Sequence, residues 1–333
     1  MKLFSFLSIL LLSGGIMSIS VHAEDVPVKI RTLFNIKDSY CSIRTNGVKG
    51  LDNRKSAYAG YGGGISSTNS LLFMENGENE ISLEIGSKSW FSKRNIDDSA
   101  RAIFSNSASC KIELIRWDNK KQTTLGSISV SIGKDGHPEE NSNHDNNIIF
   151  KKITAEQVIP GHIDPEYFSE RYYPKNMELY KFTKKIHISG IPDSKWVSAT
   201  PFTGTDEQIN GLRNAYLELA KIINMRNRKL LKNSHSIALE AWSKTTGESE
   251  DDILLSQYPK EDIEDGNVKI DPIKWDDYSV RIMNQGRIVQ FYNKSKPNYS
   301  PLSFHSKDEN GSEIMGFYAP IFSLINGKFV VVL

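Results

Sequence analysis

Apolar and polar residues alternate with a period of two along five segments in the first half of this chain. In one segment Ile81, Leu83 and Ile85 fall on one face, and polar residues fall between them. This alternation is typical of half-buried antiparallel strands, because successive side chains of a strand point to opposite faces. We expect strands at residues 28–34, 39–44, 79–85, 110–117 and 127–132.

Turn-forming pairs such as Asn76-Gly77 and Gly86-Ser87 separate these segments. Two more strand-like stretches follow at residues 148–153 and 179–188. Several short strands at this spacing favour a β-sandwich. The polar stretch 134–147 is expected to be a long surface loop. Residues 24–190 therefore predict an N-terminal antiparallel β-sandwich domain.

The second half of the sequence changes to helical patterning. Thr205 and Gln208 have the spacing of a capping box, and apolar residues then recur every three or four positions to about residue 227. Further helices are expected at 236–243 and after 249, and strands at 278–283, 287–292, 312–325 and 328–333. This order predicts a C-terminal α+β domain, residues 205–333, with helices packed on a curved antiparallel sheet. The glycines and prolines of residues 191–204 predict a linker before it.

Residues 205–333 resemble the NTF2-like (SnoaL-like) superfamily, in which helices cover a curved sheet. The resemblance rests on the helical segment 216–221 and on the closing segment 318–331, where Asn326-Gly327 precedes Lys328-Phe329-Val330-Val331. No position matches the inward His or Asp that enzymes of that superfamily use. The overall layout is similar to uncharacterised periplasmic proteins encoded near type VI secretion effector genes, some of which are thought to act as immunity proteins.

The first 23 residues have the features of a secretory signal peptide. Lys2 precedes an apolar run at residues 3–12, and Val21-His22-Ala23 has the small-x-small pattern that signal peptidase reads. The run is too short to span a bilayer, which takes about 20 apolar residues. We therefore expect cleavage near Ala23 and a periplasmic or secreted protein with no integral membrane segment.

Charge and cysteine content limit the possible partners and the fold. The chain has 41 basic and 40 acidic residues, and loss of Lys2 would leave them equal. A nucleic-acid binder needs a basic footprint, so nucleic acid is not an expected partner. Cys41 and Cys110 are the two cysteines. In an exported protein they favour one disulfide, and two buried free thiols are the alternative.

Sequence motifs give little support for catalysis. His137, Glu139, Glu140, His144 and Asp145 could together hold a divalent ion, but a polar loop rich in Asn and Ser favours simple solvation. The glycine run 60–64 lacks the helix that follows a phosphate-binding loop, and a bulge or a close backbone approach is favoured there. The sequence predicts no catalytic residue, cofactor or metal site.

Two groups of residues are candidate interaction surfaces. Trp90 and Phe91 lie outside a clear strand, where exposed rings would mark a partner or carbohydrate contact. Arg226, Arg228, Lys229 and Lys232 end the long helix and could dock an acidic surface, although cations there also complement the helix dipole.

These features predict an exported, non-enzymatic protein that binds another protein, in immunity to a secreted toxin or in self-recognition. One alternative is a ligand-binding or enzymatic pocket in the C-terminal domain, lined by Tyr216, Trp242 and Trp275. A second alternative is binding of envelope carbohydrate through Trp90 and Phe91.

Overall fold

A computed structural model describes residues 28–118, 121–141, 147–157, 172–264, 268–307 and 311–333. The predicted signal peptide, residues 1–23, lies outside these ranges, as do His144 and Asp145. We refer to residues 28–190 as the N-terminal part and to residues 205–333 as the C-terminal part. No helix in the described ranges is long and apolar enough to cross a membrane.

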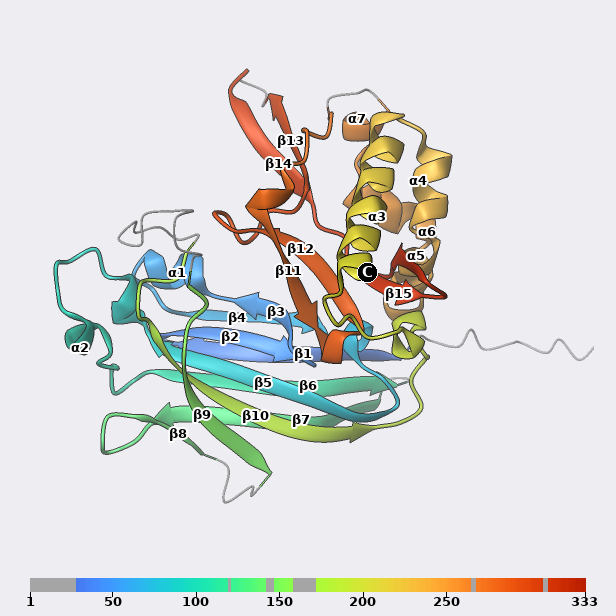
Figure 1. Cartoon of the computed structure of the whole chain (residues 1–333). Coiled ribbons are helices and arrows are strands. Elements are labelled where there is room, and N and C mark those ends of the chain that lie inside the picture. The colour runs from blue at the N-terminus through green and yellow to red at the C-terminus, as the bar shows by residue number, and fades with distance from the viewer. Residues whose placement is uncertain (1–27, 119–120, 142–146, 158–171, 265–267, 308–310) are drawn as a thin grey trace, which may run out of the picture.

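The N-terminal part contains two five-stranded antiparallel sheets (Figure 1). The first sheet has the order β4-β1-β6-β7-β8 and the second has the order β3-β2-β5-β10-β9. The strands of the first sheet are β1 (Lys29–Lys37), β4 (Gly64–Asn69), β6 (Ser109–Asp118), β7 (Lys121–Ile132) and β8 (Pro138–Glu140). Those of the second are β2 (Ser39–Thr45), β3 (Val48–Asp52), β5 (Gly77–Ser87), β9 (Ile148–Thr154) and β10 (Glu178–Ile188). All seven expected strands are present, whereas β3, β4 and β8 were not anticipated.

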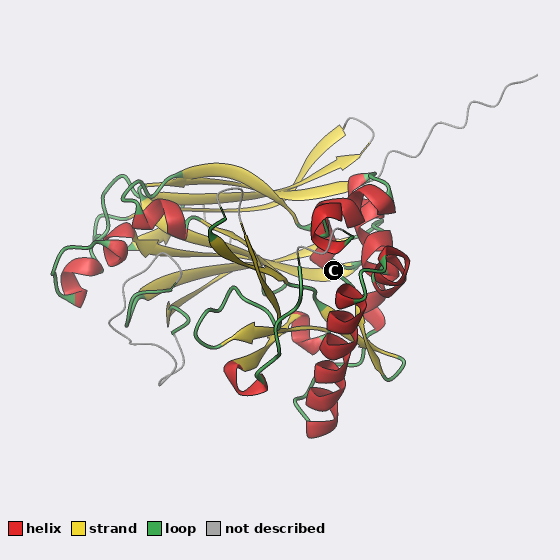
Figure 2. Ribbon diagram, turned by 90° about the horizontal axis from the view of Figure 1, so that it is seen from above, coloured by secondary structure: helices red, strands yellow, loops and turns green. Residues whose placement is uncertain are grey.

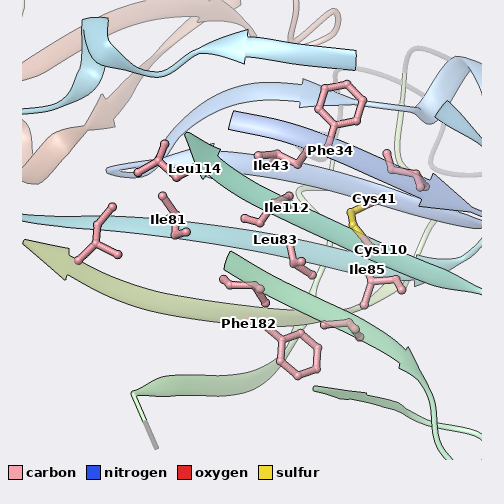
Figure 3. Packing of buried hydrophobic residues seen from close by; sticks show 14 of the residues in the cluster. Phe34, Cys41, Ile43, Ile81, Leu83, Ile85, Cys110, Ile112, Leu114 and Phe182 are labelled. Atoms are coloured by element: carbon pink, nitrogen blue, oxygen red, sulfur yellow. A yellow bond between two sulfur atoms is a disulfide. The ribbon is translucent and has the colours of Figure 1, made fainter. Parts of the chain in front are cut away.

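One hydrophobic core receives side chains from both sheets (Figure 3). Leu83 of β5 and Ile43 of β2 come from the second sheet, and Ile112 and Leu114 of β6 come from the first. These side chains are fully buried. The alternation that predicts strands therefore also identifies the face that each strand turns to the core.

The opposite face of β5 is also buried, which the alternation did not predict. Ser82 and Glu84 are buried, and Glu84 is paired with Arg44 on this face. Two short helices, α1 (Arg54–Tyr58) and the 3-10 helix η2 (Lys88–Phe91), cover another part of the same face, around Tyr40 and Leu179. The helix α2 (Asp98–Arg101) packs beside η2.

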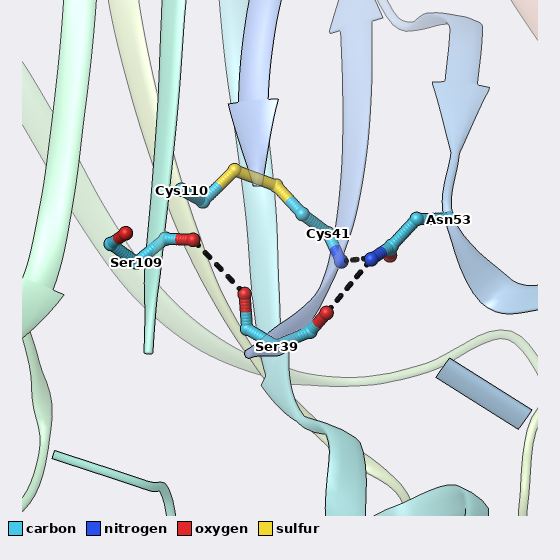
Figure 4. Close-up of a disulfide and its surroundings, with 5 residues drawn as sticks. All are labelled: Ser39, Cys41, Asn53, Ser109 and Cys110. Atoms are coloured by element: carbon cyan, nitrogen blue, oxygen red, sulfur yellow. Dashed lines mark hydrogen bonds between the residues drawn. A yellow bond between two sulfur atoms is a disulfide. The ribbon is translucent and has the colours of Figure 1, made fainter. Parts of the chain in front are cut away.

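The predicted disulfide between Cys41 and Cys110 is confirmed (Figure 4). It joins β2 of the second sheet to β6 of the first, and both residues are fully buried. Hydrogen bonds reinforce the crossing, since Ser39 Oγ donates to the Ser109 carbonyl at 3.1 Å. Asn53 Nδ2 donates to the Ser39 carbonyl at 2.8 Å, and its Oδ1 accepts from the Cys41 amide at 2.7 Å.

The C-terminal part combines helices with a four-stranded antiparallel sheet of order β11-β12-β15-β16 (Figures 1 and 2). Helices α3 and α5 pack against β16. The helices are α3 (Asp206–Asn224), α4 (Arg228–Ser234), α5 (Ser236–Thr246), α6 (Glu250–Gln257) and α7 (Lys260–Ile263). The sheet strands are β11 (Tyr278–Met283), β12 (Ile288–Asn293), β15 (Phe322–Ile325) and β16 (Lys328–Val331), and β13 (Leu302–Lys307) pairs with β14 (Glu313–Tyr318) as a separate hairpin. The prediction of a mixed fold with helices and antiparallel sheets is confirmed.

Helix α3 begins where the sequence predicts. The Thr205 side chain accepts a hydrogen bond from the Gln208 amide at 3.3 Å. The Gln208 side chain reaches further back than a capping box requires, because its Oε1 accepts from the Thr203 and Gly204 amides. Leu212, Tyr216, Leu219 and Ile223 form the buried stripe of the helix.

The expected strand at 312–325 is wrong as a single element. It divides into β14 and β15 around residues 319–321. Pro320 lies in this gap and has no backbone N–H to donate to a neighbouring strand. The break lets β14 pair with β13, while β15 joins β12 and β16.

Residues 191–204, the predicted linker, pack between the two parts. Trp196, in the 3-10 helix η3 (Lys195–Ser198), is buried beside Val48 of the N-terminal part and Ile288 of the C-terminal part. Its indole N–H donates to the Leu72 carbonyl at 3.0 Å. The two parts therefore share a small hydrophobic core at their junction.

Candidate functional site

Trp90 and Phe91 do not form an exposed surface. Both residues lie in η2, and each is only 2% exposed. The Phe91 ring packs 5.5 Å from the ring of Tyr40 on the outer face of the second sheet. The Ser87 hydroxyl caps the turn by accepting from the Ser89 amide at 3.1 Å. The predicted aromatic contact surface is therefore wrong, because η2 folds these rings inward.

The four basic residues predicted at the end of the long helix lie in two places, because the helix ends before them and a second helix begins among them. Helix α3 ends at Asn224, and a new helix starts at Arg228 after the exposed Arg226. Arg228 lies 4.0 Å from Glu264, and Lys232 Nζ lies 2.9 Å from Asp251 Oδ1. Two of the four cations are therefore paired with carboxylates, which weakens the prediction of one free cationic patch. The remaining residue, Lys229, is exposed.

The candidate metal loop is only partly described. His137 Nδ1 lies 3.0 Å from the Tyr180 hydroxyl, and Glu139 and Glu140 belong to β8. Within the described ranges, no group of three or more His, Cys, Asp or Glu residues could hold a metal ion. In the glycine run, Gly62 accepts from the Ser39 amide at 2.9 Å and has a φ of +61°, so the interpretation as a close backbone approach is confirmed.

The expected pocket residues of the C-terminal part are used for packing. The hydroxyl of the buried Tyr216 accepts from the Phe291 amide at 3.1 Å and donates to the Pro320 carbonyl at 3.4 Å. Trp275 packs 5.2 Å from the Phe291 ring. A cavity of about 220 Å³ lies elsewhere, between α3 and the strands β15 and β16. Its wall includes Glu218 and Phe329.

A different site lies where β11 of the C-terminal part meets the outer face of the second sheet. It is a cavity of about 50 Å³ lined by four cationic side chains. The cations are Arg44 from β2, Lys49 from β3, Arg54 from α1 and Arg281 from β11. The rest of the wall consists of Glu156, Tyr172, Tyr173, Pro297 and Asn298. We refer to it as the cationic cavity.

Carboxylates hold the inner cations in place. Arg44 Nε lies 2.9 Å from Glu84 Oε1, and Arg44 Nη2 lies 3.4 Å from Glu84 Oε2. Asp52 forms ion pairs with two cations: it pairs with Lys49, and its Oδ2 lies 3.2 Å from Arg54 Nη2. These pairs fix the positions of three cations before any ligand arrives.

The ion pairs overcome the cost of burial. Burial disfavours the charged form of Arg44, but the nearby Glu84 outweighs this and raises the pKa of the guanidinium. Burial likewise opposes charge on Arg54, but Asp52, Tyr173, Tyr40 and Glu156 together outweigh it and raise the Arg54 pKa. The pKa of Asp52 is lowered, because Lys49 and Arg54 more than offset its burial. All three groups remain charged at neutral pH.

Aromatic contacts stiffen the inner wall. The guanidinium carbon of Arg54 lies 4.4 Å from the centroid of the Tyr173 ring, a cation–π distance. The Tyr173 hydroxyl lies 2.8 Å from the hydroxyl of the fully buried Tyr40. Burial raises the pKa of Tyr40 well above its usual value, so the Tyr40 phenol stays neutral.

The outer wall carries the remaining ion pair. Glu156 Oε1 lies 3.4 Å from Arg281 Nη2, and Arg281 also lies over the Tyr292 ring at 4.6 Å. Among the described residues, four cations therefore face three carboxylates, which leaves one excess positive charge. Guanidinium, ammonium, phenol and amide groups suit binding of an anion.

Sequence reasoning did not find this cavity. Its residues lie far apart in the sequence, at positions 44–54, at 156, 172 and 173, and at 281–298, and none of these groups has the spacing of a known motif. The one available signal is the closeness of Arg44, Lys49 and Arg54, which surface loops often show without function.

Comparison with known proteins gives no relative to guide the assignment: no protein-family model, curated protein or solved structure matches the chain.

Proposed function

We propose that this chain is an exported, non-enzymatic binding protein whose partner is another protein, recognised at the cationic cavity. One observation carries this proposal: carboxylates hold three cations in position inside a small cavity, with a fourth cation at its outer wall. Positioned guanidinium groups recognise acidic groups, and they need no further ordering when a ligand binds.

Export is the second element of the proposal. Residues 1–23 have the pattern of a signal peptide, and a disulfide between the two sheets suits an oxidising compartment such as the periplasm. Within this proposal the two facing sheets act as a β-sandwich, residues 205–333 belong to the NTF2-like type, and the partner is a secreted toxin or a self-recognition protein.

The direct test measures binding between the exported protein and the products of genes adjacent to its own. We expect one of them to form a complex that weakens as salt is raised, since a charged cavity is screened by ions. The double variant Lys49→Gln/Arg281→Gln should reduce the affinity at least tenfold. Lys185→Gln, which removes an exposed cation paired with Glu78 on β5, is the matched control and should bind like wild type.

Two results contradict the proposal. Either no neighbouring gene product binds, or the double variant at the cavity binds as tightly as wild type.

A small-molecule function has one observation in its favour, the cavity of about 220 Å³ between α3 and the strands β15 and β16. Eight of its twelve lining residues are apolar, and the polar ones are Glu218, Asn233, Ser234 and Ser236, a mixture found in many ligand pockets. Replacing Ala215 in its wall with Trp should abolish binding of such a ligand and leave the protein complex intact. Carbohydrate binding through Trp90 and Phe91 is not retained, because both rings are buried.

A further inference from the structure

We propose that the cationic cavity binds a single carboxylate presented by a larger molecule, and that Glu156 occupies its place as an internal competitor in the unbound protein. The inference deepens the proposed function and rests on it for the nature of the partner, which would supply an acidic side chain or its C-terminal carboxylate.

The ion pairs of the cavity differ in exposure and in length. The Arg44–Glu84 pair has a contact of 2.9 Å, and its side chains are 24% and 6% exposed. The Arg281–Glu156 pair is longer, at 3.4 Å, and its side chains are 30% and 43% exposed. Exposed pairs of this kind contribute little to stability, so Glu156 can leave Arg281 at small cost.

The charge balance favours an incoming anion. With Glu156 in place the described groups carry one excess positive charge, because four cations face Glu84, Asp52 and Glu156. When Glu156 moves away, the excess rises to two. Glu156 also contributes to the raised pKa of Arg54, so its charge acts on Arg54 as well as on Arg281. A ligand carboxylate would replace this favourable interaction.

The cavity is large enough for one functional group of a ligand and too small for a whole metabolite. On the same measure a single water needs roughly 10–15 Å³, and the cavity measures about 50 Å³, which is room for a few heavy atoms. A carboxylate fills such a space, and the rest of the ligand must stay outside. The planar guanidinium of Arg281 can meet both carboxylate oxygens at once, as Arg44 meets those of Glu84.

The test titrates short peptides into the full chain purified after export, by isothermal titration calorimetry at low salt. The probes are Ac-Ala-Glu-Ala-NH2 for a side-chain carboxylate, Ac-Ala-Ala-Ala-OH for a terminal one, and Ac-Ala-Gln-Ala-NH2 as the neutral analogue. Inorganic phosphate is titrated separately. We expect at least one carboxylate peptide to bind, and the neutral analogue not to bind.

The decisive variant is Glu156→Gln, which should bind the carboxylate peptide at least fivefold more tightly than wild type. Adding Arg281→Gln should remove that gain. The matched control is Glu178→Gln, which breaks the ion pair of 2.7 Å with Lys152 outside the cavity and should leave peptide affinity unchanged.

Three results would overturn the inference. Glu156→Gln binds the peptide no better than wild type, the neutral analogue binds equally well, or phosphate binds while both carboxylate peptides do not. The proposed function fails separately: peptides that bind as expected, with no protein partner found, would contradict only the protein-binding role. If the protein complex forms with the same affinity in Glu156→Gln as in wild type, and no carboxylate peptide binds, only the carboxylate site would be contradicted.

Discussion

Arg287 and Glu75 form a bidentate ion pair across the junction of the N-terminal and C-terminal parts, although 212 positions separate them in the sequence. Arg287 Nη1 lies 2.7 Å from Glu75 Oε2, and Nη2 contacts Oε1. The guanidinium carbon also lies 5.2 Å from the centroid of the Trp196 ring. Both charged side chains are less than one-fifth exposed. This pair and the buried Trp196 join the two parts of the chain, and the wall of the cationic cavity is drawn from both of these parts.

Removing the charge of Glu75 should destabilise the fold. Glu75→Gln leaves Arg287 partly buried without its carboxylate, and we expect a loss of about 2 kcal/mol in the free energy of unfolding. Urea unfolding monitored by tryptophan fluorescence measures it. Glu78→Gln is the matched control, because its pair with Lys185 is exposed, and it should change stability by less than about 0.5 kcal/mol. Equal losses in both variants would contradict a special role for the junction.

Replacing Trp196 should destabilise the fold, to an extent that depends on the size of the new side chain. Trp196→Ala empties the shared core at the junction, and we expect it to cost about 3–5 kcal/mol. Trp196→Phe keeps the ring packing but loses the hydrogen bond to the Leu72 carbonyl, which should cost about 1–2 kcal/mol. Urea titration of both variants gives the comparison. A loose linker would instead tolerate both changes.

The disulfide should be a large source of stability. The two cysteines are 69 positions apart, and closing a loop of that length restricts the unfolded chain by about 4 kcal/mol on the chain-entropy model. The double variant Cys41→Ala/Cys110→Ala should lose roughly this amount in urea unfolding. Reduction of the native protein should be slow, because both residues are fully buried. Rapid reduction under native conditions would contradict the burial.

The sequence predicted those helices and strands whose formation depends on residues within one segment. The alternation in β5 and β6 and the apolar stripe of α3 each lie within one segment, so the sequence alone was sufficient for them. The short strand β4 was missed, because Gly64 and the serines after it lack apolar alternation. The division of 312–325 at Pro320 could have been predicted, since proline interrupts a strand ladder.

Burial of the outer face and formation of the cavity depend on tertiary contacts. Trp90 is buried because η2 folds over the second sheet, a contact between segments that no spacing reveals. Arg281 joins Arg44, Lys49 and Arg54 only when β11 lies against the N-terminal part. Ordinary surface cations have the same sequence pattern, so the candidate site could be recognised only in the structure.

His235 should make stability depend on pH in a defined window. It is 2% exposed, its Nε2 lies 2.8 Å from the Tyr258 hydroxyl, and its Nδ1 lies 3.0 Å from the Leu231 carbonyl. Burial lowers the His235 pKa to about 4, whereas an exposed histidine titrates near about 6.5. Between these values the unfolded chain binds a proton that the folded chain does not. Stability should therefore fall by up to about 3 kcal/mol as the pH is lowered from about 6.5 to 4.

A variant at this position separates the effect of His235 from that of other groups. His235→Gln removes the titrating group, so the free energy of unfolding of this variant should change less across the same window than that of wild type. The variant should be less stable than wild type at pH 7. His187→Gln on β10 is the control, because the His187 side chain is exposed, and it should keep the wild-type slope. Unfolding by guanidinium chloride at pH 7, 6, 5 and 4.5 gives the change of the free energy of unfolding with pH for each protein. The carboxyl of Asp38, whose pKa the hydrogen bond to Lys88 lowers to about 2, loses its contribution only at lower pH. Glu240, whose pKa the hydrogen bond to Lys244 lowers, contributes at the acidic end of the window in wild type and variant alike, so the difference between the two slopes reports on His235. An unchanged slope in His235→Gln would mean that the histidine is protonated in the folded protein and that its contacts differ from those described.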